Sequence, residues 1–199
     1  TAVFEWVDFY VDAVRGRDTS NGWSEQTAKR TLQAAVDAAA DYETIYVLPG
    51  VYKPIDLGLK ELYVVGQEGA AKTVIDGGGT NRCVTMTSSW DSQVSGLTLT
   101  HGFAEEGGGA FGGSLYNCIV SNNVAYWGGG CYSTYLQNCL IAGNTVIGSP
   151  YGGRGNGGGT QYGTLRNCTV VGNRIAQSGF GGGTYYGYAY NSVIVGNTV

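Results

Sequence analysis

The chain has 199 residues, 35 of them glycine, and a formal net charge of −4. This length is enough for one sizeable core, and 43% apolar residues with 15 tyrosines exclude a disordered chain. With three prolines and no Gly-X-Y period the chain is not collagen. It has no apolar run long enough for a membrane span, and its acidic balance offers no basic surface for nucleic acid.

Charge and glycine are distributed unevenly along the chain. All 15 acidic residues lie in residues 1–106, whereas residues 107–199 contain 24 of the 35 glycines and 10 of the 15 tyrosines. The only charged residues of that second half are Arg154, Arg166 and Arg174. The first residue is Thr1 rather than methionine, which indicates a mature or excised chain.

Residues 1–43 are expected to form a strand near 9–11 and then one helix. Thr31 is suited to the N-cap position of that helix. The apolar residues that follow recur with a helical period and define a single face: Leu32, Ala35, Val36 and Ala39. We predict a helix over 31–40 that covers the N-terminal end of the domain.

Residues 44–106 contain short runs of β-branched and aromatic residues without a helical period. These runs lie at 44–48, 62–65, 73–75 and 83–87. We expect residues 44–106 to form irregular first coils of a single β domain and residues 107–199 to form regular ones.

The second half is an internal repeat built on triple glycines that end at Gly109, Gly130, Gly159 and Gly183. Nine residues after each triplet comes Cys118, Cys139, Cys168 or Ser192, directly preceded by Asn117, Asn138, Asn167 or Asn191. Five residues further on lie Asn123, Asn144, Asn173 and Asn197. A degenerate copy upstream has Leu97 and Gly102 at the equivalent positions, and the successive periods are 21, 21, 29 and 24 residues.

A period near 21 with short β-type runs predicts a solenoid of parallel strands, one coil per repeat. Helical repeats would need a 3.6-residue period, and leucine-rich repeats and propeller blades need other compositions or lengths. Equivalent residues of neighbouring coils would stack at about 4.8 Å. We expect Asn138 and Asn167 to satisfy buried backbone groups in such a ladder, unlike Asn156, which lies in an inserted loop at 148–156.

Several segments resemble a known family. Residues 10–13, 18–22, 31–39, 46–52, 73–78 and 94–99 look like secreted bacterial right-handed parallel β-helix proteins of the pectin-lyase-like superfamily. The GGG and Asn repeats resemble the GGA and FxxN repeats of chlamydial polymorphic membrane proteins, with Cys or Ser and a β-branched residue replacing Phe. The resemblance implies an all-β, single-stranded right-handed parallel β-helix with one N-terminal capping α-helix, located outside the cell or on its surface.

The same resemblance implies where an enzyme of this fold would act. Pectate lyases use acidic ligands for Ca²⁺ and an Arg or Lys base, and the related hydrolases use clustered Asp. No acidic residue follows Glu106, so a catalytic site would have to draw on Asp76, Asp91, His101, Glu105 and Glu106, with Lys72 and Arg82. Each also has a structural interpretation as a turn or solvated corner residue. No metal or other cofactor is expected, except Ca²⁺ under the lyase hypothesis.

The cysteines and aromatic residues have two interpretations each. The Cys118, Cys139 and Cys168 ladder is expected to fill a narrow core rather than form disulfides, and a bond between Cys83 and Cys131 stays open. Aromatic residues gather two places beyond the glycine triplets and in the inserted loop. They predict either a carbohydrate-binding face or stacking between coils, and the candidate ligand-binding residues are Tyr132, Tyr151, Arg154, Tyr162 and Tyr185.

Three functions are compatible with these observations. The first is a non-catalytic extracellular scaffold or adhesin, whose partners are polysaccharide, adjacent domains of a longer surface protein, or a second copy joined head to tail through residues 1–9. The second is a polysaccharide lyase or glycoside hydrolase acting near residues 72–106. The third, ice binding, requires an outward threonine array that Thr98, Ile119, Leu140, Thr169 and Val193 do not make.

Overall fold

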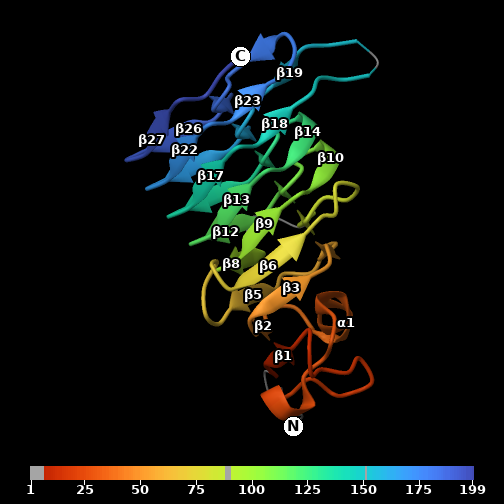
Figure 1. Cartoon of the computed structure of the whole chain (residues 1–199). Coiled ribbons are helices and arrows are strands. Elements are labelled where there is room, and N and C mark those ends of the chain that lie inside the picture. Colours follow the sequence, from red (N-terminus) through yellow and green to blue (C-terminus); the bar gives the residue numbers. More distant parts are fainter. Residues whose placement is uncertain (1–6, 88–90, 151) are drawn as a thin grey trace.

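The computed structural model describes residues 7–87, 91–150 and 152–199 and is a parallel β-helix (Figure 1). The chain winds as a stack of coils, and successive coils add strands to sheets that run along the stack. Neighbouring strands pair in parallel and in register, as Leu115, Leu136 and Leu165 do. The fold class predicted from the repeat and the resemblance, a nearly all-β parallel β-helix with one N-terminal α-helix, is confirmed.

Two long sheets form what we call face A and face B. Face A contains β1 (Phe9–Val11), β2 (Thr44–Val47), β5 (Tyr63–Gly66), β8 (Gln93–Ser95), β12 (Ser114–Tyr116), β16 (Tyr135–Gln137), β21 (Thr164–Arg166) and β26 (Tyr188–Tyr190). Face B contains β3 (Gly50–Tyr52), β6 (Thr73–Asp76), β9 (Thr98–Thr100), β13 (Ile119–Ser121), β17 (Leu140–Ala142), β22 (Thr169–Val171) and β27 (Val193–Val195).

Two shorter sheets complete the coils. Face C contains β4 (Ile55–Asp56), β7 (Val84–Thr85), β11 (Ala110–Phe111), β15 (Cys131–Tyr132), β20 (Thr160–Gln161) and β25 (Thr184–Tyr185). Face D contains β10 (Phe103–Glu106), β14 (Val124–Trp127), β18 (Thr145–Val146) and β23 (Arg174–Ile175). Because face D begins only at β10, the first coils have three faces and the later coils have four.

The corners of the four-faced coils explain the repeat. They are residues with left-handed backbone, five positions apart: Gly128, Ser133, Asn138 and Gly143 in one coil, and Gly157, Tyr162, Asn167 and Gly172 in the next. Left-handed backbone costs most L-residues about 1–2 kcal/mol, and glycine and asparagine adopt it most readily. The first glycine of each triplet and the first asparagine of each repeat are therefore corner residues.

The two asparagine ladders lie in different environments. In the inner ladder Asn123, Asn144 and Asn173 are fully buried, and Asn197 is half-buried. Asn144 Nδ2 donates to the Val120 carbonyl and to Asn173 Oδ1, both at 2.9 Å. The outer ladder is exposed, and its side chains bond mainly to one another, as Asn138 Nδ2 does to Asn117 Oδ1 at 3.3 Å. The expectation that Asn138 and Asn167 satisfy buried backbone groups is therefore wrong, because these residues serve as left-handed corners.

The core is narrow and contains reduced cysteines. Cys118, Cys139 and Cys168 are buried free thiols that donate to the carbonyl two residues earlier, at 3.2, 3.3 and 3.2 Å. Cys83 and Cys131 are also free and buried, so the bond left open between them is absent. Burial raises the pKa of Cys83 to about 12, which keeps its thiol protonated and unreactive.

The helix α1 (Leu32–Ala38) packs against the first strands. Thr31 Oγ1 accepts a hydrogen bond from the Ala34 N–H at 3.3 Å, as expected of an N-cap. At the other end, Lys60 Nζ donates to the Val36 and Ala39 carbonyls, both at 2.7 Å. A short 3₁₀ helix, η1 (Glu25–Thr27), precedes α1. No helix in the described part of the chain has the length and apolarity needed to cross a membrane.

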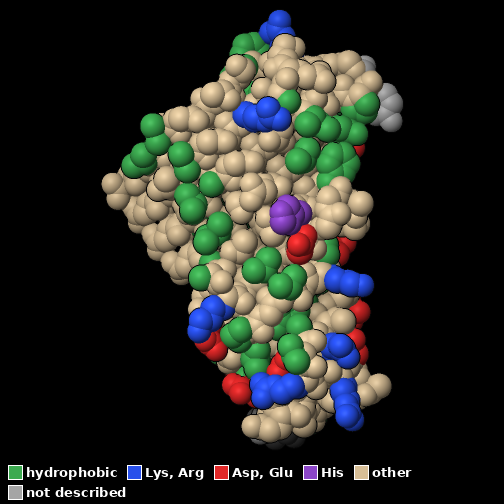
Figure 2. Space-filling view, in the orientation of Figure 1, with side chains coloured by type: hydrophobic (Ala, Val, Ile, Leu, Met, Phe, Trp, Pro, Cys, Tyr) green, Lys and Arg blue, Asp and Glu red, His purple; other side chains and the backbone are tan. Residues whose placement is uncertain are grey.

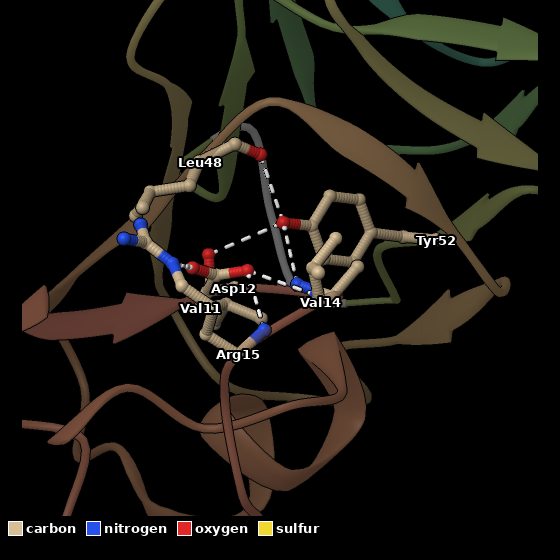
Figure 3. Close-up of polar contacts among 7 residues, drawn as sticks. Val11, Asp12, Val14, Arg15, Leu48 and Tyr52 are labelled. Atoms are coloured by element: carbon tan, nitrogen blue, oxygen red, sulfur yellow. Dashed lines mark hydrogen bonds and ion pairs between the residues drawn. The ribbon is translucent and has the colours of Figure 1, made fainter. Parts of the chain in front are cut away.

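A polar cluster fastens the loop after β1 to the first complete coil (Figure 3). The buried Tyr52 hydroxyl donates to the Leu48 carbonyl at 2.8 Å and accepts from the Ala13 N–H at 3.3 Å. Asp12 accepts from the Val14 and Arg15 N–H groups at 2.9 and 3.0 Å. Burial raises the Asp12 pKa, but these bonds and the Arg15 guanidinium outweigh it and hold that pKa below its usual value.

Candidate functional site

A groove runs along the N-terminal half, beside α1 and the start of face C. One cavity of about 540 Å³ is lined by residues that include Lys53, Asp56, Asn81 and Arg82. A second cavity of about 360 Å³ shares Gln33, Lys53 and Pro54 with the first, so that the two are continuous. The charged residues of the combined lining are Arg30, Lys53, Arg82 and Asp56. The groove therefore favours an anionic or strongly hydrogen-bonding ligand.

The side chain of Gln33 on α1 lines both cavities. Its Oε1 accepts from the Asp56 N–H at 2.9 Å, and its Nε2 donates to the Asp56 carbonyl at 3.1 Å. This amide thus pairs with the edge of β4 as a further strand would. The same Nε2 reaches Asp37 Oδ1 at 2.9 Å, which holds the amide in place. The helix consequently positions Asp56 in the groove.

Arg82 closes the groove at its face C end. Its Nε donates to the Glu106 and Gly107 carbonyls at 3.1 and 3.0 Å, and its Nη2 donates to the Glu106 carbonyl at 2.8 Å. Its Nη1 donates to Thr85 Oγ1 at 3.0 Å, and the guanidinium carbon lies 4.9 Å from the centre of the Phe111 ring. Burial lowers the Arg82 pKa, although Glu106 and Asp56 oppose this effect. Among the described residues these bonds use three of five N–H groups, so two remain for a ligand.

An aromatic platform continues from Arg82 along face C. We define it as the rings of Phe111, Tyr132, Tyr162, Tyr185 and Tyr186. Phe111 stacks on Tyr132 at 5.7 Å between ring centroids, Tyr132 meets Tyr162 edge-on at 5.4 Å, and Tyr162 stacks on Tyr186 at 5.9 Å. Four successive strand pairings separate Thr85 from Tyr185 on face C, which corresponds to a length of roughly 19 Å along the stack.

Glu106 supports the platform rather than facing solvent alone. Burial and a hydrogen bond to the Glu106 carboxylate raise the pKa of Tyr132 to about 12. The phenol therefore stays protonated, and available as a hydrogen-bond donor, at every physiological pH. The predicted candidates Glu106 and Tyr132 come together at one place, on adjacent faces D and C.

The inserted loop brings a second guanidinium to the far end of the platform. Arg154 lies 5.1 Å from the centre of the Phe180 ring, and Phe180 stacks on Tyr185 at 6.0 Å. The Trp127 indole donates to the Arg154 carbonyl at 3.3 Å. The loop ends in β19 (Gly155–Asn156), which pairs with β24 (Gly179–Phe180) in the next coil. Tyr151 and most of the proposed donor segment 1–9 lie outside the described residues.

The other predicted catalytic residues are dispersed. Asp76 and His101 meet at a corner of face B with Oδ2 and Nδ1 3.3 Å apart, and the histidine is visible beside an acidic side chain (Figure 2). Glu105 is exposed on β10, and Asp91 is exposed shortly before β8. Within the described ranges no three or more His, Cys, Asp or Glu residues are placed to hold a metal ion.

Sequence reasoning named Arg82 but missed the other residues that build the groove. Lys53 precedes β4, which ends at Asp56, in a coil that carries no repeat. Gln33 bonds to Asp56 from 23 positions away in the sequence. The only sequence signal was local, because a polar pair next to Pro54 and Ile55 interrupts an apolar run. Nothing in that pattern indicates which other coil it meets.

Comparison with known proteins supports the fold. No protein-family model and no curated protein sequence matches the chain. Solved structures similar to it include a pectin methylesterase bound to a hexasaccharide, with 13% identity, a TM-score of 0.56, and coverage of 84% of this chain and 56% of that one. The pectin methylesterase from carrot is also similar, with 15% identity, a TM-score of 0.52, and coverage of 89% of this chain and 60% of that one. So is the pectate lyase Pel9A, with 14% identity, a TM-score of 0.50, and coverage of 97% of this chain and 78% of that one.

These likenesses are structural, and the chain spans little more than half the length of the first of these pectin methylesterases. At such identities they establish a shared architecture and leave function to the site itself. The chain therefore has the parallel β-helix fold of pectin methylesterase and pectate lyase, with a cationic groove and an aromatic platform on one face.

Proposed function

We propose that this protein is an extracellular, non-catalytic β-helix that binds a linear acidic polysaccharide along face C. The observation that carries the proposal is the backbone of Tyr162 and Tyr186, which occupy left-handed corners with φ of 55° and 48°. The same corner of the preceding coils is Gly112 or Ser133. A bulky residue there costs about 1–2 kcal/mol, and strain of this kind concentrates at functional sites.

Burial does not offset that strain. The side chain of Tyr162 is 46% exposed and that of Tyr186 is 71% exposed. Flat phenol rings present a large amphipathic area with little loss of side-chain entropy on binding, and this suits the apolar faces of sugar rings. The platform thus has the geometry of a binding surface for an extended chain of sugars.

The guanidinium groups at the two ends select the charge of the ligand. Arg82 and Arg154 each lie over an aromatic ring at 4.9 and 5.1 Å, which fixes the plane of the guanidinium. A fixed guanidinium binds carboxylates through paired N–H groups better than a lysine does. Lys53 adds a further cation in the groove. A polyuronate, which carries one carboxylate per sugar, fits this arrangement.

The experiment is a binding panel with matched variants. Calorimetry on hexagalacturonate, methyl-esterified pectin, xylan and cellohexaose should rank the first probe highest. The double substitution Tyr162→Ala and Tyr186→Ala should weaken hexagalacturonate binding by about tenfold, equivalent to about 1.4 kcal/mol. The control is Tyr190→Ala on face A, which removes a ring that is 50% exposed. Equal affinity of the double variant and the parent protein would refute the platform.

A catalytic role is the second candidate, and one observation favours it. Asp56, which lines the groove, and Glu106, which does not, both raise the Arg82 pKa, so two carboxyl groups lie within electrostatic reach of one guanidinium. Glycoside hydrolysis needs such a pair, and β-elimination by a lyase of this fold would need Ca²⁺ as well. Reducing-end and unsaturated-product assays on polygalacturonate, with Ca²⁺ or with chelator, test this role. Turnover that Asp56→Asn abolishes would replace the non-catalytic proposal.

A further inference from the structure

The middle of face C contains one polar residue in a column of aromatic ones. In register, Phe111 is followed by Tyr132, then Gln161, then Tyr185. Gln161 is only 5% exposed, and its Oε1 is a buried acceptor without a hydrogen-bond partner among the described residues. Buried polar atoms in proteins are nearly always paired. An unpaired amide oxygen at this place therefore needs an explanation.

The surroundings of Gln161 form an aromatic enclosure. Tyr132 and Tyr185 precede and follow it in the column, and Tyr162 is the next residue in the chain. The four rings make consecutive contacts, with Tyr132 to Tyr162 at 5.4 Å, Tyr162 to Tyr186 at 5.9 Å and Tyr186 to Tyr185 at 4.5 Å. An aromatic residue at position 161 would have continued the stack, so the fold itself does not require glutamine there.

We propose that Gln161 is a specificity-determining residue of the platform and that its Oε1 accepts a hydrogen bond from a sugar hydroxyl. This inference rests on the proposed function. A carbonyl oxygen can only accept, so it selects a hydroxyl over an ether, an ester or a carboxylate at the same position. Sites of this kind reject an analogue without the donor, because the buried acceptor is then left unpaired.

Two tyrosines beside Gln161 have exposed rings that can rotate. Tyr162 and Tyr186 are 46% and 71% exposed, and side-chain rotations of exposed residues are fast. Inward packing does not hold Gln161, because the adjacent Thr160 is the core-facing residue and bonds to Thr184 Oγ1 at 3.0 Å. Gln161, which would bind the hydroxyl, is therefore a different residue from Thr160, which packs in the coil.

The test compares Gln161→Leu with the parent protein on two probes, hexagalacturonate and a derivative that has methylated hydroxyls and free carboxylates. We expect Gln161→Leu to weaken binding of hexagalacturonate by about tenfold and to leave binding of the methylated probe unchanged. The melting temperature should stay equal or rise, since the substitution removes an unpaired buried acceptor. Gln161→Met, which keeps an unbranched side chain, should give the same pattern if the leucine variant folds poorly.

The control is Gln137→Leu on face A, whose Oε1 accepts from the Tyr135 hydroxyl at 2.9 Å. This variant should lower the melting temperature and leave both affinities unchanged. If the parent protein binds hexagalacturonate and both Gln161 variants bind it equally well, the inference is wrong while the proposed function stands. If the parent protein binds neither probe nor any member of the panel, the proposed function fails first.

Discussion

The two halves of the β-helix place their chemistry by different means. Residues 7–87 form three-faced coils of irregular length that bear most of the charge, and their groove lies beside the helix α1. Residues 107–199 form four-faced coils with a corner every five residues and carry three charged side chains. In the first half, the proposed binding site depends on coils that carry no repeat. In the second, it depends on exceptions within the repeat, such as a tyrosine at a corner.

The contrast between halves also appears on the surface. The space-filling view shows acidic and basic side chains gathered over the N-terminal coils and few over the later ones (Figure 2). The regular coils are held instead by ladders of neutral groups, which stay satisfied only while the register is kept. We therefore expect single substitutions in the ladders to lower the stability of the second half strongly. In the first half, the sensitive positions should be those of the polar cluster around Tyr52 and Asp12.

The largest expected effect is the loss of an inner ladder residue. Asn144→Leu removes side-chain hydrogen bonds to the Val120 carbonyl, to Asn173 Oδ1 and to two groups of Asn123, all between 2.9 and 3.0 Å. We expect destabilisation by about 4 kcal/mol, since each unpaired buried group costs about 1–3 kcal/mol. Urea unfolding of the purified variant measures this value.

The matched change is Asn138→Leu on the outer ladder. Asn138 is exposed with φ of 56°. The substitution should therefore destabilise the protein only through the left-handed backbone at this corner, by about 1–2 kcal/mol. Asn138→Gly should then be close to neutral. Equal losses for the two leucine variants would mean that the inner and outer ladders are assigned to the wrong sides of the coil.

These paired ladders show what the sequence can predict. The constant spacing from glycine triplet to cysteine predicted the register, and in the structure Leu136, at one equivalent position, pairs with Leu115 and Leu165. Asn138 and Asn144 have the same type and the same period, yet one is exposed and the other fully buried. The difference comes from the five-residue corner geometry, which a 21-residue period does not reveal. The groove was not predictable for a related reason, because its coils have no repeat to align.

The next effect concerns the glycine triplets. A Cβ on Gly158 would lie 2.2 Å from the Gly182 carbonyl oxygen of the next coil, whereas one on Gly172 meets nothing within 4 Å. Gly158→Ala should therefore cost about 3 kcal/mol through overpacking. Gly172→Ala, at φ of 64°, should cost about 1 kcal/mol from backbone conformation alone. Thermal unfolding of both variants shows whether close contact between coils or the left-handed backbone conformation is the stronger reason for glycine at these positions.

A smaller effect on stability is expected at Tyr52, in the polar cluster of the first half. Tyr52→Phe removes the hydroxyl bonds to Leu48 and Ala13 and should cost about 1 kcal/mol at neutral pH. Burial raises the Tyr52 pKa to about 12, against 10.0 for an unfolded tyrosine. Between these values the unfolded chain loses a proton that the folded chain keeps, so stability falls as pH rises. The phenylalanine variant should lose less stability over that interval, and parallel decline of both proteins would contradict the assignment.

The smallest effect is expected at Asp76, the predicted catalytic candidate that the structure places away from the groove. The hydrogen bond from the Gly78 N–H, at 2.8 Å, lowers the Asp76 pKa more than partial burial raises it, and His101 lowers it further. Stability from this carboxylate is therefore present above its usual pKa and is lost as pH falls through the lowered one.

Asp76→Asn keeps an oxygen for the Gly78 N–H and loses only an exposed pair with His101, worth at most about 1 kcal/mol. Asp76→Ala also loses the turn bond and should be less stable than the asparagine variant. Neither should change polysaccharide affinity, because Asp76 lies on face B and the platform on face C. A tenfold loss of binding or of turnover in Asp76→Asn, with unfolding unchanged, would move the functional site to the face B corner.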